Sequence, residues 1–461
     1  MTALVWFRTD LRSLDHRALT SACAQHQQVR ALYLLCPRQL DEHIVAPIRR
    51  QFLRRAIDEL SRQLAELGIE LDIIIADHFS DVPVALNTYC RQHQISEVYA
   101  HREWLVDEMQ RDHSCTQVLT EELNIPLQLI DDSLLSPLSI AKNDGSPYRM
   151  FTPFSRRCRD HLQADFPRCQ RRPKAIGSSV LAASCPLFGE ESDSSLWPVR
   201  EDLVLEKLKD FCAARAPDYI RDRDFPSLTG TSQLSAALAL GLISPRQGLA
   251  RLQQECGDLI WDAKSGAGCW LNELLWREFY RHVAYHFPQV VKGQAFQSPT
   301  EAIPWPNNKS LFEAWQLGQT GYPIVDAGMR QLAETGWMHN RLRMITASFL
   351  CKDLHIDWRW GERHFLENLI DADFASNNGG WQWAASTGTD AAPYFRIFNP
   401  TTQGQRFDAG ADFIKHFVPE LEHLPPKQCH QPHDVINYPK ALVDHSEMRK
   451  ITLALFQAIR D

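Results

Sequence analysis

The sequence has no cysteine pattern that would hold a disulfide framework or a structural zinc ion. Its 12 cysteines are scattered along 461 residues and none forms a C-x-x-C pair, whereas both kinds of site need clustered spacing. The run CHQPH near the end offers Cys429, His430 and His433 as ligands, but its Pro-rich surroundings indicate a surface loop. We therefore expect reduced, buried thiols, a cytoplasmic protein and no bound metal.

Long apolar runs are also absent, and no stretch reaches the length of a membrane span. The first residues, MTALVWFRTDLR, lack the layout of a signal peptide and are typical of a first strand. The formal net charge of −8 argues against a general nucleic-acid-binding protein. It does not exclude a local basic face, because binding depends on the local field. A chain of this length is expected to form two domains.

Strand-like and helix-like segments alternate over residues 1–131. The strand-like runs are 3–7, 29–36, 69–75, 97–100 and 126–130, and an intervening helix carries Leu53, Ile57, Leu60, Leu64 and Leu67 on one face. Such alternation predicts an α/β domain with a parallel, Rossmann-like sheet and crossover helices. No G-x-G-x-x-G follows the first strand, so we do not expect a pyrophosphate cofactor in this domain.

The rest of the chain has a different character. Residues 132–197 are rich in Ser, Pro, Arg and Cys and are expected to form an interdomain linker with one helix near 151–164. Residues 198–461 show helical segments broken by Gly and Pro, which predicts an all-α domain. Ten of the 13 tryptophans lie there. Core packing explains any single one of them, but their concentration as a set is harder to explain in that way.

Hydroxyl side chains gather in LTGTSQLSAALALG, where Thr229, Thr231, Ser232 and Ser235 precede a helical run. Hydroxyls and free backbone N–H groups at the start of a helix suit a phosphate group. An ordinary Ser/Thr N-cap is the alternative interpretation.

Aromatic and charged side chains share one helix face in CWLNELLWREFYRHV. Trp270, Glu273, Trp276, Arg277 and Tyr280 recur at helical spacing. This mixture suits the wall of a polar cavity that binds rings. The alternative is a helix–helix interface with an internal Glu–Arg pair.

A third segment, TGYPIVDAGMRQLAETGWMHNRLRMITASFL, places Asn340 and Met344 on one face of a helix. Arg341, Arg343, Arg330 and Lys352 add positive charge near aromatic rings, which suggests contact with phosphates and bases. A solvated charged face is the alternative.

A fourth segment, SNNGGWQWAASTGTD (376–390), carries no obvious nucleophile, base or set of metal ligands. Asp371 and Asp373 precede it, and they could bind a metal, pair with Arg343, or accept hydrogen bonds from ribose hydroxyls or ring N–H groups. Arg396 and Gln403 follow it and add polar groups near two rings.

These motifs resemble the DNA photolyase/cryptochrome family, and within it the bacterial folate-type photolyases for cyclobutane pyrimidine dimers. The resemblance covers nearly the whole chain and is weakest over 132–197. It implies FAD bound in the helical domain. It also implies light-driven electron transfer to a flipped-out pyrimidine dimer in UV-damaged DNA, which splits the cyclobutane ring.

The resemblance also implies roles for single residues. FAD would be held by Tyr219, Thr231, Ser232, Gln233, Leu234, Ser235, Trp270, Arg343, Asp371, Ala372, Asp373 and Asn377, with Arg343 paired to Asp371 and Asn377 facing the flavin N5. The dimer would be contacted by Trp276, Trp383, Glu273, Asn340 and Met344. Candidates for contact with the DNA strand are Arg223, Arg277, Arg341, Arg396 and Gln403.

Two further functions are implied by the resemblance. Trp381, Trp358 and Trp305 would relay electrons from the flavin to the surface. A folate antenna, 5,10-methenyltetrahydrofolate, would be contacted by His43, Glu108 and Lys292. Asp107 stands where this subtype is expected to carry Asn, and the added carboxylate would weaken folate binding.

The main alternative is a cryptochrome-type blue-light photoreceptor. Plant-type cryptochromes tend to carry Asp in place of Asn377, and many have a long disordered tail, whereas this chain ends soon after an expected last helix. A photolyase for (6-4) photoproducts would have histidines in place of Asn340 and Met344. A light-independent flavoprotein that binds DNA would leave the tryptophans unexplained. We expect a monomeric repair enzyme.

Overall fold

A computed structural model describes residues 2–459. The chain forms two compact units. The first comprises Met1–Tyr148, Thr152–Pro217 and Ser232–His286, and the second Arg149–Phe151, Asp218–Thr231 and Phe287–Asp461. These units do not coincide with the domains expected from the sequence. Much of the segment 198–286 belongs with the sheet, because residues such as Arg246 make buried contacts to it.

The first unit is built on a five-stranded sheet in the order β3-β2-β1-β4-β5. All neighbouring strands are parallel. The strands are β1 (Thr2–Phe7), β2 (Gln28–Leu35), β3 (Leu71–Ile75), β4 (Ile95–His101) and β5 (Leu127–Ile130). The predicted parallel α/β fold is confirmed. Each expected strand begins and ends within two residues of the observed strand.

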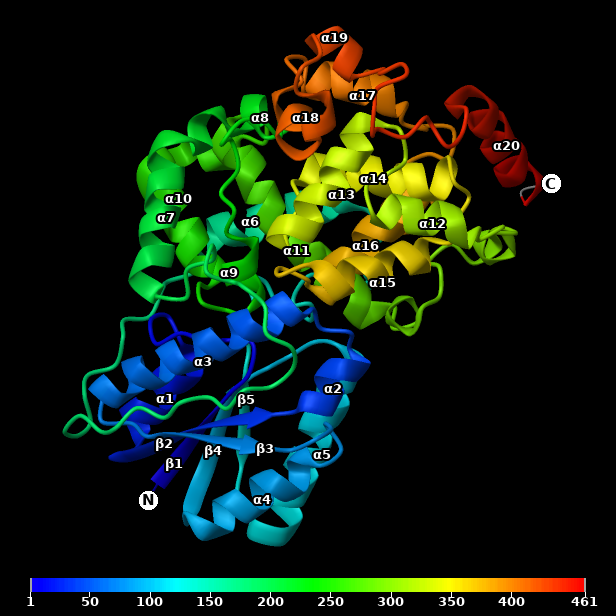
Figure 1. Cartoon of the computed structure of the whole chain (residues 1–461). Coiled ribbons are helices and arrows are strands. Elements are labelled where there is room, and N and C mark those ends of the chain that lie inside the picture. Colours follow the sequence, from blue (N-terminus) through cyan, green and yellow to red (C-terminus); the bar gives the residue numbers. More distant parts are fainter. Residues whose placement is uncertain (1, 460–461) are drawn as a thin grey trace. The chain divides into compact units, whose positions relative to one another are not determined.

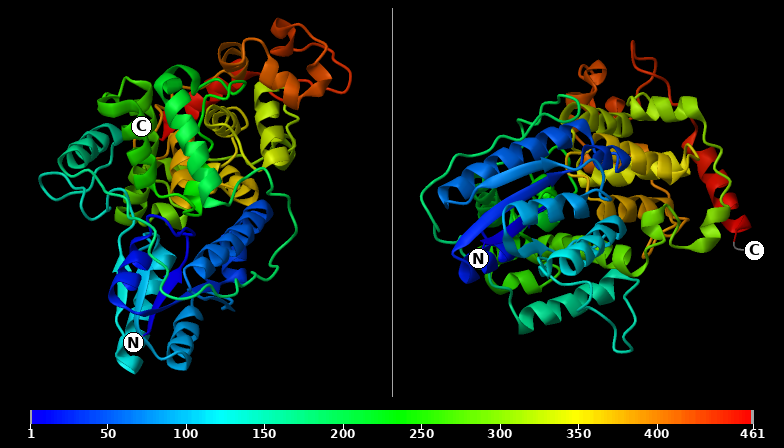
Figure 2. Two further views of the ribbon diagram at one scale, coloured as in Figure 1. Left: turned by 90° about the vertical axis from the view of Figure 1, so that its left-hand side faces the viewer. Right: turned by 90° about the horizontal axis from the view of Figure 1, so that it is seen from below.

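Helices cover both faces of the sheet. Right-handed crossovers place α1 (Arg17–Gln25) and α3 (Pro47–Glu66) on one face and α4 (Val82–Gln92) and α5 (Val106–Leu123) on the other. Figure 2 shows α3 on the opposite side of the strands from α4 and α5. The core under α4 and α5 includes Leu4, Trp6, Leu86 and Leu119.

The chain leaves the sheet through a long extended segment that follows α3. The amides of Ile176 and Val180 donate to the carbonyls of Leu67 and Ala65, and the amide of Cys185 donates to Asp58 Oδ1. The further helices of the first unit are α2 (Pro37–Glu42), α6 (Phe151–Ala164, whose first residue belongs to the second unit), α7 (Glu201–Ala214), α9 (Ser235–Ala239), α10 (Pro245–Cys256) and α11 (Gly266–His286). The expected helix near 151–164 is therefore present.

As predicted, the regular elements of the second unit are all helices: among the residues that the structure describes, it has no strand (Figure 1). Its helices are α8 (Tyr219–Asp222), α12 (Lys309–Gln316), α13 (Pro323–Thr335), α14 (Asn340–Lys352), α15 (Trp358–Asn368), α16 (Phe374–Ala385), α17 (Pro400–Phe407), α18 (Asp412–Phe417), α19 (Pro426–Cys429) and α20 (His445–Ala458). Short 3-10 turns, among them η3 (Val290–Lys292) and η4 (Ser298–Ala302), link them.

Every cysteine of the sequence is a free thiol, as expected. The expectation of a surface loop at CHQPH is wrong for its first two residues. Cys429 lies in α19 and is fully buried, and its thiol donates to the carbonyls of Leu421 and Leu424. His430 is also buried. No helix within residues 2–459 combines the length and the apolar character needed to cross a bilayer.

The last helix, α20, contributes a buried hydroxyl that joins two polar groups of other segments. Thr452 Oγ1 donates to the carbonyl of Lys352 at 2.6 Å and accepts from His355 Nε2 at 2.8 Å. Both partners are buried, so neither can turn to water if the hydroxyl is removed.

We expect Thr452→Val, which keeps the shape of the side chain, to lower the free energy of unfolding by about 1–3 kcal/mol because two buried polar groups lose their partner. Thr452→Ser keeps the hydroxyl and is the matched control. Urea denaturation measures the difference. Equal stability of the valine and serine variants would contradict this account of α20.

Candidate functional site

Two carboxylates precede α16 and have separate tasks. Asp371 is buried and accepts two hydrogen bonds from Arg343 Nη2, at 2.8 and 3.0 Å. The expected ion pair is therefore present, and Arg343 Nε also donates to the carbonyl of Met338. Asp373 caps α16, since its Oδ1 accepts from the amide and the hydroxyl of Ser376 at 2.9 and 2.8 Å. Ala372, between them, is buried.

The two asparagines of α16 are fixed by α15. Asn377 Nδ2 donates to the carbonyl of Glu362 at 3.0 Å. Asn378 Nδ2 donates to Glu362 Oε1 at 2.8 Å, and its Oδ1 accepts from Gln382 Nε2 at 3.0 Å. Sequence reasoning gave Asn378 no role. It is the buried link between Glu362 and Gln382.

Burial in this network raises the pKa of Glu362 to about 7, although its hydrogen bond from Asn378 opposes the shift. The carboxyl group therefore changes its protonation state near neutral pH. Glu362 lies on α15, next to the helix α16 that carries Asn377. Sequence reasoning also missed Glu362. The signal in the sequence was weak, because α15 also carries Glu367, Arg359 and Arg363 and does not single out Glu362.

Trp381 of α16 is packed tightly against α15. A Cβ at Gly361 would lie 2.1 Å from the Trp381 ring, so only glycine fits there. The ring contacts Phe365 and Trp315, with centroids 4.9 and 6.1 Å away.

The other two tryptophans of the expected relay lie in the same unit. Trp358 is buried, and Trp305, just after η4, is half-buried. The expected relay residues therefore range from buried to partly exposed.

The charges near α14 are largely neutralised within the second unit. Arg341 forms an ion pair with Asp224 at 2.7 Å and stacks on Phe407, and Arg330 pairs with Glu420 at 2.8 Å. The positive face suggested by the sequence is thus reduced. Asn340, at the start of α14, is exposed, and one turn later Met344 is half-buried.

Lys352, at the end of α14, is buried and does not contribute to a charged face. Its Nζ donates to Ser386 Oγ at 2.9 Å and to the carbonyl of Arg396 at 3.4 Å. Burial lowers the pKa of its amine to about 8. It joins the end of α16 to the loop that carries the exposed side chain of Arg396.

The remaining predicted residues of the second unit lie on three short segments. Trp383 of α16 contacts Phe398, at 6.4 Å between centroids, and Gln403 of α17 is half-buried. Arg223 stacks over Tyr219, at the start of α8, at 5.8 Å. Thr231 ends the segment that follows α8.

The first unit carries the other predicted residues, which are fewer. Ser232, Gln233 and Leu234 lead into α9, which begins at Ser235, and Gln233 has a positive φ of 50°. The short helix α9 is tied to α11, because Arg277 Nη2 donates to the carbonyl of Leu238 at 3.2 Å.

Trp270, Glu273 and Trp276 share α11 with Arg277. Trp270 is buried, packed on Phe211 and on Gly248. Arg277 forms an ion pair with the buried Glu278 of the same helix, at 3.3 Å. Glu273 and Trp276 are half-buried.

The predicted antenna residues are divided between the units. In the first, His43 Nε2 lies 3.1 Å from Asp107 Oδ2. The pKa of the neighbouring Glu108 is raised to about 7, first by burial and then by the charge of Glu103. Lys292 belongs to η3 in the second unit.

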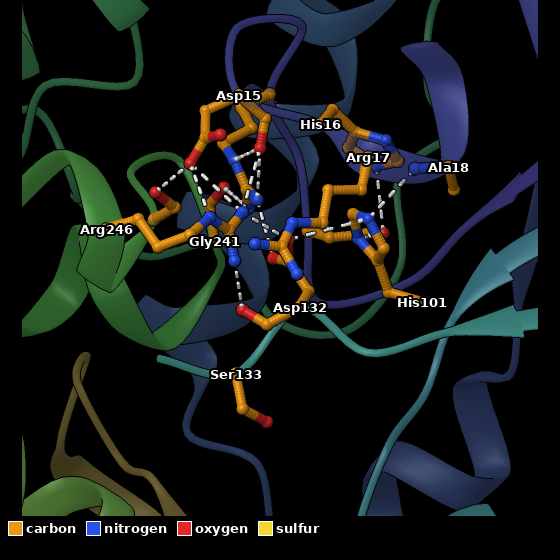
Figure 3. Close-up of polar contacts among 12 residues, drawn as sticks. Asp15, His16, Arg17, Ala18, His101, Asp132, Ser133, Gly241 and Arg246 are labelled. Atoms are coloured by element: carbon orange, nitrogen blue, oxygen red, sulfur yellow. Dashed lines mark hydrogen bonds and ion pairs between the residues drawn. The ribbon is translucent and has the colours of Figure 1, made fainter. Parts of the chain in front are cut away.

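One acid, Asp10, and two histidines, His16 and His101, form a buried group at the carboxyl edge of the sheet, beside the paired strands β1 and β4. Figure 3 shows the two histidines. His16 Nδ1 accepts from the amide of Leu19, and His101 Nε2 accepts from the amide of Ala18. The other nitrogen of each ring therefore carries the proton, 2.9 and 2.7 Å from Asp10 Oδ2.

The unprotonated nitrogen of each ring already accepts a hydrogen bond from a backbone amide. This group is therefore not arranged to bind a metal ion. Burial lowers the pKa of His16 to about 4, so its ring is neutral at physiological pH. In open α/β sheets this edge is the usual ligand crevice. Here side chains fill it.

Comparisons with known proteins agree with the motifs. The model of the DNA photolyase family matches residues 3–173, and the model of the FAD-binding domain of DNA photolyase matches residues 270–458. The deoxyribodipyrimidine photo-lyases of Salmonella typhimurium and Escherichia coli are 45% and 44% identical to the chain, each over 100% of it and 99% of their own length. The chain belongs to the DNA photolyase family.

Solved photolyase structures share the fold. A class III photolyase from Agrobacterium tumefaciens is similar with a TM-score of 0.85 and 32% identity, over 100% of this chain and 98% of that one. A cryptochrome from Synechocystis is similar with a TM-score of 0.87 and 30% identity, over 98% and 99%. The fold is therefore common to photolyases and cryptochromes, and the full-length relatives named above are photolyases.

We expect Glu362→Gln to change how the stability of this photolyase depends on pH. The carboxyl group titrates near 4.5 when unfolded and near 7 when folded. Between these values the folded chain holds a proton that the unfolded chain has released. The glutamate thus lowers the free energy of unfolding as pH rises, by up to about 3 kcal/mol.

The glutamine variant should lack that loss, so its stability relative to the original chain should increase from about pH 5 to about pH 8. Urea denaturation across this range measures the difference. Parallel curves for the two chains would mean that Glu362 is already ionised at the lower pH.

Proposed function

We propose that the chain is a deoxyribodipyrimidine photolyase that splits cyclobutane pyrimidine dimers in UV-damaged DNA under blue light. Full-length relatives at 44–45% identity that bear this name carry the proposal. Bound FAD supplies the light-driven electron transfer. The protein's task is to bind, orient and shield, which is consistent with a site that has no nucleophile and no general base.

The residues present suit a flavin dinucleotide. The hydroxyls of Thr231, Ser232 and Ser235, together with the backbone between them, are the proposed diphosphate ligands. The Asp371 carboxylate, already paired with Arg343, carries no uncompensated charge toward an adenosine or flavin ring. The side chains that fill the crevice at the sheet edge support the proposal that FAD is held by these segments instead.

Asn377 is proposed to face the flavin N5. Its Nδ2 is held by the Glu362 carbonyl at 3.0 Å, which fixes the orientation of the amide. An amide both donates and accepts, so it can serve a flavin nitrogen with or without a proton. Gly379 and Gly380 follow on α16, and no heavy atom lies within 4 Å of a Cβ built on Gly380.

The flipped-out dimer is proposed to lie against Trp276 and Trp383, with Glu273 and Asn340 as hydrogen-bond partners and Met344 packed beside it. A dimer stacks poorly in the duplex, which lowers the cost of flipping. Arg223, Arg277, Arg341, Arg396 and Gln403 are proposed to face the DNA strand. Arg396 is the most accessible of these cations, because the guanidinium groups of Arg341 and Arg277 already have partners in the protein.

A folate antenna is proposed at His43, Glu108 and Lys292. The His43–Asp107 contact brings a carboxylate to the position where an amide is expected. We expect this contact to weaken folate binding. A cryptochrome-like photoreceptor is the second candidate, favoured by the similarity to the Synechocystis structure.

The decisive assay is repair of a thymine-dimer oligonucleotide by the reduced holoprotein in blue light and in darkness. We expect repair only in light. A photoreceptor of the cryptochrome type would bind flavin and respond to light but leave the dimer intact, and that outcome would contradict the proposal.

Trp305→Phe tests the proposed relay. Because phenylalanine is much harder to oxidise than tryptophan, we expect photoreduction of oxidised flavin to slow strongly, while repair by pre-reduced enzyme is spared. Trp197→Phe, at a buried tryptophan of the first unit, is the matched control and should photoreduce normally. Unchanged photoreduction in Trp305→Phe would remove this residue from the relay.

A further inference from the structure

The segment that follows α9 is anchored to the sheet edge by a buried carboxylate. Asp15 Oδ2 accepts from Ser244 Oγ at 2.5 Å and from Arg246 Nε at 3.0 Å. All three residues are fully buried. They are separated by about half of the chain, since Asp15 lies between β1 and α1 whereas Ser244 caps α10.

A second carboxylate, Asp132, completes the network (Figure 3). Its Oδ1 accepts from Arg246 Nη2 at 2.6 Å and its Oδ2 from Arg12 Nη2 at 2.5 Å. Arg12 Nη1 also donates to the carbonyl of Gly241 at 3.1 Å. Two buried guanidinium groups are thus balanced by two carboxylates, and His101 lies 3.5 Å from Asp132.

The backbone after α9 touches the loop after β1 directly. The amide of Leu11 donates to the carbonyl of Leu240 at 3.1 Å. A Cβ on Gly241, which has a φ of +67°, would lie 2.3 Å from the carbonyl oxygen of Thr9. Such close approach is open only to glycine, and it fixes the position of this segment on the sheet.

The helix α9 depends on neighbouring segments for its position, namely α11, through the Arg277–Leu238 hydrogen bond, and the residues that follow α9. It spans five residues, Ser235–Ala239, and isolated helices of that length are unstable in water. Its N-terminal side carries the proposed diphosphate ligands 231–235, and its C-terminal side runs directly into the anchored residues 240–246. The anchor therefore fixes the chain directly after α9, and together with the Arg277–Leu238 bond it sets where α9 and the proposed ligands lie in the first unit.

We propose that Asp15, Asp132, Arg12 and Arg246 are positioning residues for FAD. Their buried charge network holds segment 240–246 against the sheet and thereby sets the place of the diphosphate ligands. The proposal rests on the function proposed above. It makes flavin affinity depend on buried residues at the sheet edge that are not among the proposed FAD ligands.

Loss of one carboxylate should loosen the segment locally. Without the charge of Asp15, two guanidinium groups remain buried beside a single ionised partner, Asp132, and an uncompensated buried charge is strongly unfavourable. Moving segment 240–246 away from the sheet edge relieves this cost while the sheet itself stays paired. The diphosphate ligands lose their fixed position in the process.

Asp15→Asn tests the proposal against Asp72→Asn, a control with similar partners at a partly exposed site. Asp72 lies on β3 in the same unit and likewise accepts from an arginine, Arg30 Nη2 at 2.7 Å, and from a hydroxyl, Tyr89 at 2.5 Å. Both chains are purified with FAD, and flavin release is followed by its fluorescence. The melting temperature of each flavin-free chain is the measure of overall stability.

We expect Asp15→Asn to weaken FAD binding by about tenfold or more. We expect Asp72→Asn to bind FAD as the unaltered chain does. Equal FAD affinity in Asp15→Asn and Asp72→Asn would overturn the positioning role. It would also be overturned if both variants lost FAD affinity and both lost the same amount of melting temperature. An unaltered chain that binds no FAD would instead contradict the proposed function itself.

Ser244→Ala keeps the test decisive if Asp15→Asn does not fold. It removes the hydroxyl that donates to Asp15 and the cap of α10, and leaves the buried charges balanced. Its control is Asn308→Ala, which removes the cap of α12. We expect faster FAD release from the serine variant alone. The same release rate from both variants would contradict the proposal.

Discussion

The buried charges at the carboxyl edge of the sheet constrain the rest of the structure. In most open α/β sheets this edge is the place for a nucleotide. Here Asp15, Asp132, Arg12 and Arg246 meet there, with the Asp10–His16–His101 group beside them. Because buried charges are stable only as a complete, balanced set, the crevice cannot be opened for a ligand without separating them. This agrees with the proposal that other segments hold the cofactor.

That constraint agrees with how the helical residues are arranged. The polar groups in and before α16 make structural contacts. Asp373 caps the helix, and Asn378 links Glu362 to Gln382. Arg343 neutralises Asp371. None of them forms a pair of nucleophile and base. In a site where a flavin supplies the chemistry, the protein needs fixed amides and close-packed rings, and these are what the sequence SNNGGWQWAASTGTD provides.

The sequence predicted features that depend on local pattern. All five strands appear in the sequence as apolar runs and were found, although β3 and β5 are only partly buried. The Arg343–Asp371 pair followed from the family resemblance. The sequence did not predict contacts between polar residues that are far apart along the chain. Asp15 and Arg246 are 231 positions apart, and no periodicity joins them. Lys352 was expected to add surface charge and is buried, because the charge of a residue does not reveal which partners will surround it.

The central claim is that helical segments hold the flavin while the sheet edge stays closed. Hydrogen–deuterium exchange of the flavin-free protein, with and without added FAD, tests it most directly. We predict that FAD protects the amides of 229–245 and 371–377 and leaves those of 8–16 and 101–104 unchanged. New protection at the sheet edge, with none in the helical segments, would contradict the account.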